Sequence, residues 1–121
     1  IRYINNNLMS ATYVSNLVIN TYTDFSQIFD LSDSQSNSAL NLTGYSVSSQ
    51  MRKYQNSKNY VSFAATVYNS SAGQIKIGLT TSQTASIKPG RYIYDIIVID
   101  NSGKTSRVVE GMVLVREGAT H

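Results

Sequence analysis

The stretch Ile87–Val115, IKPGRYIYDIIVIDNSGKTSRVVEGMVLV, decides the fold of this 121-residue chain. A run rich in Tyr and Ile extends from Arg91 to Ile99. The polar tetrapeptide Asp100–Gly103 follows it, and a second apolar-rich run extends from Thr105 to Val115. Two such runs around a turn that contains glycine predict an antiparallel β-hairpin.

Both strands of this hairpin have an unusual outer face. Side chains alternate between the faces of a strand, and Asp95 and Glu110 mark the two outer faces, so Tyr92 and Val109 should point into the core. The outer faces still carry six apolar residues: Ile93, Ile97, Ile99, Val108, Met112 and Leu114. Two explanations remain open. Another part of the chain, such as the N-terminal arm, covers these residues, or they form a contact surface for another protein.

The composition describes one globular domain rich in strands and turns. Hydrophobic residues make up 41% of the chain, and charged residues only 14%, below the usual quarter. The net charge is +3 and the basic residues are scattered, whereas nucleic-acid binding proteins cluster them, so we expect no nucleic-acid partner. The absence of cysteine excludes disulfides and thiolate metal sites. No run approaches the ~18 apolar residues of a membrane span, so we expect no membrane partner.

The rest of the chain predicts an N-terminal arm, Ile1–Ala11, and a sandwich domain over residues 12–121. Alternating patterns predict strands over residues 13–21, 24–31, 45–52, 61–68 and 74–79, and residues 81–86 predict one helical turn that crosses between sheets. Seven strands in one domain favour an all-β, Ig-like antiparallel β-sandwich, with a closed barrel as the alternative.

Alternation also predicts the core of the sandwich. The expected core residues are Phe25, Phe29, Val47, Met51, Phe63, Val67, Ile75, Ile77, Leu79, Tyr92, Ile96, Val109 and Val113. The spacing Gly90-x-Tyr92-x-Tyr94 supports the immunoglobulin type of sandwich. A tyrosine in such domains lies two residues before the second cysteine. Tyr92 has the place of that tyrosine here, and Tyr94 has the place of the cysteine.

No group of residues predicts a catalytic site. The single histidine is His121, the last residue, and the usual phosphate-binding, zinc-binding and nucleophile motifs are absent. Asp24, Asp30 and Asp33 could approach one another and hold Ca²⁺, but their spacing favours solvated loops. We therefore expect neither catalytic residues nor a cofactor. Several of the nine tyrosines fall at strand ends or in loops, where rings stack on a sugar, contact a partner protein or pack at the rim. These are Tyr13, Tyr22, Tyr54, Tyr60 and Tyr68.

Five short segments together suggest a family. They are Leu42-Thr43-Gly44-Tyr45, Gln50-Met51-Arg52-Lys53, Leu79-Thr80 with Gln83-Thr84-Ala85, Lys88-Pro89-Gly90-Arg91-Tyr92 with Tyr94-Asp95, and Arg107-Val108-Val109-Glu110-Gly111. From about Phe25 onward the chain resembles the small Ig-like virion structural proteins of tailed bacteriophages. The likeness is strongest to the tail- or baseplate-associated proteins of marine T4-like phages, and the Ig-like domain of the upper baseplate protein is more distant.

The resemblance implies a non-enzymatic protein of the virion. Its partners would be other phage structural proteins, and many copies would belong to a symmetric assembly. We expect docking through the N-terminal arm and the six outer residues of the hairpin. Two other classes remain: a capsid decoration protein, and a carbohydrate-binding or adhesin module that uses the exposed tyrosines.

Overall fold

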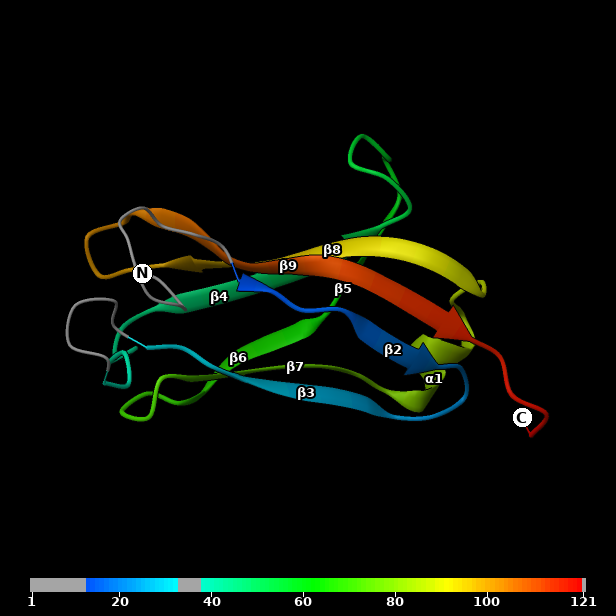
Figure 1. Cartoon of the computed structure of the whole chain (residues 1–121), viewed down its shortest axis with the longest axis horizontal. Coiled ribbons are helices and arrows are strands. Elements are labelled where there is room, and N and C mark those ends of the chain that lie inside the picture. Colours follow the sequence, from blue (N-terminus) through cyan, green and yellow to red (C-terminus); the bar gives the residue numbers. More distant parts are fainter. Residues whose placement is uncertain (1–12, 33–37, 121) are drawn as a thin grey trace.

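A computed structural model describes residues 13–32 and 38–120 of the chain. The described residues form two β-sheets packed face to face, with one short helix between strands of different sheets (Figure 1). The chain is therefore an all-β sandwich, as predicted. In chain order the elements are β1 (Tyr13–Val14), β2 (Leu17–Asn20), β3 (Phe25–Asp30), β4 (Ser46–Arg52), β5 (Tyr60–Ser62), β6 (Ala64–Asn69), β7 (Gln74–Leu79), α1 (Thr81–Ala85), β8 (Gly90–Ile99) and β9 (Thr105–Arg116).

The predicted hairpin is the centre of the larger sheet, which we call sheet A. Its strands β8 and β9 pair antiparallel along their whole length. On one side β4 and then β5 continue the sheet, both antiparallel, and on the other side β1 and β2 run parallel to β9. The smaller sheet B is antiparallel and has the order β3-β7-β6.

The turn of the hairpin is built around one carboxylate. Asp100 Oδ1 accepts hydrogen bonds from the Ser102 N–H at 2.9 Å, the Ser102 hydroxyl at 2.8 Å and the Lys104 N–H at 2.9 Å. These donors, above all the Ser102 hydroxyl, hold the pKa of Asp100 below its usual value because they favour the charged form. Gly103 completes the turn with a φ of +88°, a conformation that glycine adopts without steric cost.

The segment between β4 and β7 differs from the prediction of one strand over residues 61–68. The chain changes sheets at Phe63, so that β5 belongs to sheet A and β6 to sheet B. The Phe63 N–H donates to the Ser49 carbonyl at 3.0 Å, and its side chain is buried. The alternation of residues 61–67 continues through this crossing, which is why the sequence pattern resembles one strand.

Helix α1 makes the other crossing, from β7 in sheet B to β8 in sheet A, as predicted. Thr80 caps it: the Thr80 hydroxyl accepts from the Gln83 N–H, and the Gln83 side chain accepts from the Thr80 N–H. The fully buried Thr84 joins the helix to the turn before β3, because its hydroxyl donates to the Thr23 carbonyl at 2.8 Å.

The core lies between the sheets and contains every residue predicted for it, with four of them at its margin. Phe25, Val47, Val67 and Tyr92 are partly buried, and the remaining predicted residues are fully buried. Nine further residues are buried. Tyr94, Val98 and Val115 lie on the faces of the hairpin that were predicted to point into the core, and the others are Leu17, Ile19, Leu31, Leu42, Ile87 and Val108.

The two tyrosines at the start of β8 support the immunoglobulin type of sandwich. The Tyr92 hydroxyl donates to the carbonyl of Lys88, four residues upstream, at 2.5 Å, which is the bond of a tyrosine corner. Tyr94 is buried at the position of the cysteine and packs edge-on against Phe63, with ring centroids 6.3 Å apart. Sheet B has the order expected for the second, fifth and fourth strands of the Ig scheme, but the first strands, β1 and β2, pair with the last strand of sheet A and not with β3.

Candidate docking face on sheet A

The outer face of sheet A carries five of the six residues that the sequence predicted there. Ile93 and Ile97 on β8 are partly buried. Ile99, Met112 and Leu114 are 39%, 49% and 38% exposed. All five alternate with buried residues of the same strands and so point away from the core. We call this surface the apolar face.

Val108 was predicted on the outer face, and that prediction is wrong. Ile96 pairs with Val109, but Ile97 pairs with Arg107, so Val108 is the extra residue of a β-bulge. The bulge reverses the alternation in β9. It leaves Val108 only 3% exposed, within the core, and brings Arg107 to the outer face.

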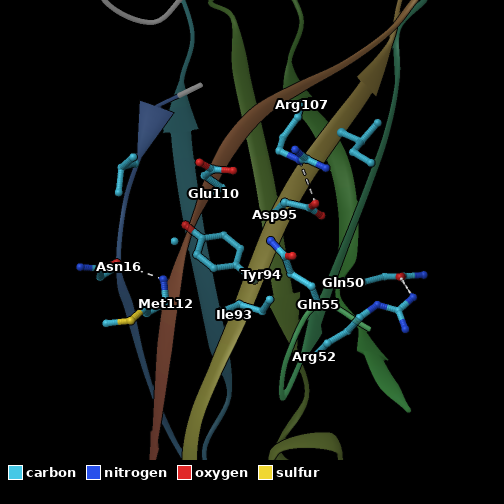
Figure 2. A pocket seen from close by; sticks show the side chains of 13 residues that line it. Asn16, Gln50, Arg52, Gln55, Ile93, Tyr94, Asp95, Arg107, Glu110 and Met112 are labelled. Carbon is cyan, nitrogen blue, oxygen red and sulfur yellow. Dashed lines mark hydrogen bonds and ion pairs between the residues drawn. The ribbon is translucent and has the colours of Figure 1, made fainter. Parts of the chain in front are cut away.

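The same bulge creates an ion pair beside the apolar face. Arg107 Nε lies 3.1 Å from Asp95 Oδ2 on the neighbouring strand. Glu110 lies directly opposite Asp95 in the ladder, so two carboxylates and one guanidinium gather at this point (Figure 2). Both partners of the pair are partly exposed, so we expect its contribution to stability to be small.

Two further apolar residues of this face come from the first strands. Val14 and Val18 are 62% and 50% exposed. They lie beside the hairpin because Val14 pairs with Glu110 and Val18 with Leu114. Alternation in the sequence contains part of this information. If Leu17 and Ile19 point into the core, as they do, Val18 between them must face outward. The parallel pairing with β9 was the missing information.

A groove runs over this face, with a volume of about 780 Å³. Figure 2 shows its lining residues, which come from β1, β4, β8 and β9 and from the loops that follow β1 and β4. The apolar lining consists of Val14, Ile93, Ile97 and Met112, and the polar lining includes Asn16, Gln50, Arg52, Gln55, Asp95, Arg107 and Glu110. A smaller hollow of about 230 Å³ lies next to it, and Met112 lines both.

Two hydrogen bonds, one of them partly buried, fix the edge of the groove. The Ser15 carbonyl lies between β1 and β2 and turns inward, where it accepts from the Tyr94 hydroxyl at 2.6 Å. The Asn16 side-chain oxygen accepts from the Met112 N–H at 3.0 Å. A side chain therefore supplies the acceptor that the Ser15 carbonyl would otherwise offer to the ladder, and β1 and β2 are two strands for this reason.

Gly111 makes this arrangement possible. A Cβ atom at position 111 would lie 2.1 Å from the Ser15 carbonyl oxygen, so only glycine leaves room for it. Burial raises the pKa of Tyr94 to about 12, so the hydroxyl stays protonated and donates at any physiological pH. The first strand is thus attached to sheet A by its side chains and by its backbone.

The carboxylates considered for Ca²⁺ have other partners. Asp24 Oδ1 accepts from the Thr81 N–H and the Thr81 hydroxyl, both at 2.9 Å, at the start of α1. Asp30 accepts from the Gln74 side chain at 2.9 Å. Asp33 and His121 lie outside the described residues. Within residues 13–32 and 38–120 no three His, Cys, Asp or Glu residues form a group able to hold a metal ion.

The exposed tyrosines do not gather on one strand. Tyr54, Tyr60 and Tyr68 are more than half exposed. The Arg52 guanidinium lies 4.6 Å from the Tyr60 ring centroid, and the Lys76 amine lies 5.5 Å from the Tyr68 ring centroid. Tyr60 belongs to sheet A and Tyr68 to sheet B. A cation therefore occupies one side of each of these rings.

The predicted N-terminal arm, Ile1–Ala11, lies outside the described residues. No helix in the described part of the chain is long and apolar enough to cross a membrane.

Comparisons with known proteins give only distant structural likenesses. No protein family matches the sequence, and no curated protein matches it. Among solved structures, a mutant of the SrpA adhesin from Streptococcus sanguinis is 12% identical, with a TM-score of 0.49 over 84% of this chain. An internalin-like protein of Listeria monocytogenes and a family 123 glycoside hydrolase from Clostridium perfringens are also 12% identical, with TM-scores of 0.42 and 0.41 over 88% of this chain.

This chain spans only part of each of those proteins: 54% of the adhesin, 28% of the internalin-like protein and 23% of the hydrolase. At such identities and TM-scores the likenesses transfer no function. The functional question therefore depends on the apolar face itself.

Proposed function

We propose that this protein is a non-enzymatic structural component of a bacteriophage particle, a tail or baseplate protein that docks to other particle proteins through the apolar face. The observation that carries the proposal is the number of apolar side chains on that face. Seven of them, from four neighbouring strands, lie on both sides of the charged cluster of Asp95, Arg107 and Glu110, and Met112 lines both hollows. Apolar side chains gathered on one surface, with polar groups among them, mark contact sites in soluble proteins.

The chemistry of the groove favours a protein as its occupant. Aliphatic side chains and a methionine form its apolar part, and such residues adapt to apolar side chains of a partner. Its charged lining residues, Asp95, Glu110, Arg52 and Arg107, balance in sign. They therefore suit the mixed polar rim of a protein interface better than a nucleic acid, which requires excess positive charge.

The energetics favour a partner that is held in an assembly. Five side chains of the face are at least 38% exposed: Val14, Val18, Ile99, Met112 and Leu114. Covering about half of the surface of each side chain, which is roughly the part now exposed, would contribute on the order of 5 kcal/mol. Association itself costs at least about 4 kcal/mol, so one isolated contact would be weak. Many such contacts in a symmetric particle act together and become stable.

The test compares two charged variants of the full chain. Ile97→Asp places a charge on the apolar face, and Thr66→Asp, the matched control, places one on the exposed outer face of sheet B. Both variants should keep the circular dichroism and melting behaviour of the unmodified protein. We expect Ile97→Asp to lower the copy number in purified particles at least tenfold, whereas Thr66→Asp assembles normally.

Three results would contradict the proposal. Normal incorporation of a folded Ile97→Asp variant would show that the apolar face is not the docking surface. Electron cryo-microscopy that placed the protein on the outside of the capsid shell would instead favour the capsid decoration class. Loss of assembly with Thr66→Asp alone would show that the docking surface lies on sheet B.

A further inference from the structure

The exposed edges of the two sheets are protected to very different degrees. An open edge presents unpaired backbone N–H and C=O groups, and proteins usually protect it with short strands, bulges, prolines or lysines. In the described part of the chain, β5 has only three residues, and β6 carries an irregularity between Val67 and Asn69. The edge formed by β1 and β2 is interrupted at Ser15.

Strand β3 has none of these protections. Its six residues, FSQIFD, pair with β7 in an unbroken register, and they include no proline and no lysine. It is the outermost strand of sheet B, and no strand among residues 13–32 and 38–120 pairs with its other side (Figure 1). Its regular edge is therefore the place where sheet B can be extended.

The direction of its backbone groups follows from one hydrogen bond. The Leu31 N–H donates to the Gly73 carbonyl at 2.8 Å, on the side of β7. Successive residues in an antiparallel ladder direct their backbone groups to opposite sides. Phe25, Gln27 and Phe29 therefore face β7, and Ser26, Ile28 and Asp30 direct their N–H and C=O groups outward.

We propose that β3 pairs antiparallel with β3 of a second copy of this chain, about a two-fold axis that passes through Ile28. Sheet B would then continue across both molecules, with three strands from each. Ile28 would lie opposite Ile28 of the second copy, and Ser26 opposite Asp30. Each of the three outward residues exchanges an N–H and a C=O with its counterpart, so the pairing forms about six backbone hydrogen bonds.

The side chains select this register over its neighbours. A Ser26 hydroxyl opposite an Asp30 carboxylate is a donor opposite an acceptor, and Ile28, which is 38% exposed, gains an apolar neighbour. An axis through Asp30 would place two carboxylates opposite each other. An axis through Ser26 would shift most of each strand beyond the end of the other. The nearest alternative axes, through Gln27 or Phe29, would place Ile28 opposite Ser26 or Asp30 and so lose the contact between the two isoleucines. A shift of one strand by a single residue would oppose outward groups with inward ones.

This interface is independent of the docking proposed for the apolar face. It lies at the edge of sheet B, whereas the apolar face covers sheet A, and neither uses a residue of the other. A phage particle built from many copies would use both contacts, but each can fail alone.

Single cysteines test the register, because the unmodified chain contains none. Hydrogen-bonded antiparallel partners have Cα atoms about 5.5 Å apart, within the range for a disulfide. Under mild oxidation Ile28→Cys should form a covalent dimer. Ser26→Cys is the matched control and should form no disulfide-linked dimer. An equimolar mixture of Ser26→Cys and Asp30→Cys should form the disulfide-linked mixed dimer.

Sedimentation equilibrium of the unmodified full chain supplies the second measurement. We expect a concentration-dependent dimer. Ile28→Pro removes an outward N–H that the fold itself does not use, so it should weaken the dimer at least tenfold with little change in melting temperature. Ile28→Thr keeps that N–H and should retain the dimer. A monomer at all concentrations would overturn the proposal, as would disulfide formation by Ser26→Cys equal to that of Ile28→Cys, or a dimer unaffected by Ile28→Pro.

Discussion

The two outer faces of this sandwich have opposite characters, although both cover the same core. Sheet A presents Val14, Val18, Ile93, Ile97, Ile99, Met112 and Leu114. Sheet B presents mostly polar or small residues: Ser26, Asp30, Ala64, Thr66, Gln74, Lys76 and Gly78. Alternation accounts for the inner faces of both sheets equally well. The two sheets differ in the outward-facing residues, which the fold itself does not need, and that difference is the reason for the docking proposed on sheet A.

The edges differ in the opposite sense. Side chains fasten the edge of sheet A, since Tyr94 and Asn16 hold the first strand through the Ser15 carbonyl and the Met112 N–H. The edge of sheet B at β3 is a regular strand with backbone groups directed outward, where the Ile28 carbonyl accepts a 3.4 Å hydrogen bond from the exposed Gln27 side chain. The contact proposed for sheet A therefore uses its outer face, and the contact proposed for sheet B uses its edge. Four substitutions test how firmly the two sheets are joined and how far their edges differ.

The largest effect is expected for Phe63→Ala, which removes the side chain that connects the two sheets. Phe63 contacts Phe25 of sheet B, with ring centroids 5.9 Å apart, as well as Tyr94 of sheet A. The lost burial and the resulting cavity should lower the free energy of unfolding by about 3–5 kcal/mol. Denaturant titration measures this loss, with Tyr68→Ala as the exposed control. A loss below about 1 kcal/mol would show that the sheets adhere without this contact.

The next effect compares two glycines that each lie beside an edge of a sheet: Gly111 on β9 faces Ser15, and Gly78 on β7 faces Phe25 of β3. In Gly111→Ala the new Cβ would lie 2.1 Å from the Ser15 carbonyl oxygen, and in Gly78→Ala 2.9 Å from the Phe25 carbonyl oxygen. The fastened strand must move farther, so we expect Gly111→Ala to cost about 2–3 kcal/mol and Gly78→Ala about 1 kcal/mol. Thermal melts of both variants provide the comparison. Equal losses would remove the distinction between a fastened and an open edge.

A loss of about 1–2 kcal/mol is expected for Tyr94→Phe, which leaves the partly buried Ser15 carbonyl without its donor. This variant also has a pH signature. The pKa of Tyr94 is about 12 in the folded protein and 10.0 without burial. The unfolded chain releases the proton first, so the stability from this group is complete below pH 10 and is lost between pH 10 and 12.

Chemical denaturation of the unmodified protein and of Tyr94→Phe across that range isolates this contribution. The stability difference between the two proteins should narrow as the pH rises. A difference that stays constant from pH 9 to pH 12 would mean that Tyr94 is not the group responsible.

The sequence predicted the fold closely because alternation is a local signal. The hairpin, its turn, helix α1 and the predicted core residues follow from spacing along single strands. Val108 was assigned to the wrong face because Val108 and Val109 are both apolar, so the pattern looks the same with or without a bulge. The division at Phe63 was invisible for a similar reason, since alternation continues through the crossing.

The docking face was predicted only in part because it is assembled from distant segments. Val14 and Val18 join it through parallel pairing with β9, almost one hundred residues away in the chain, and the groove requires β4 as well. The Ser15 carbonyl and Gly111 meet in the same way. No spacing within one segment indicates such a meeting, because register between distant strands is set by tertiary packing.

The parallel pairing of the first strand with the last has a mechanical consequence. Tyr13 lies opposite Val109, near the start of β9, and Arg116 lies at the end of β9, opposite Asn20 of β2. A tension that pulls these two points apart acts along both strands, so the hydrogen bonds between them are sheared together and cannot be peeled apart one at a time. The Ser15 N–H to Glu110 and Thr21 N–H to Arg116 bonds, both 2.9 Å, bracket this loaded segment. A domain pulled in this way resists until several hydrogen bonds break together.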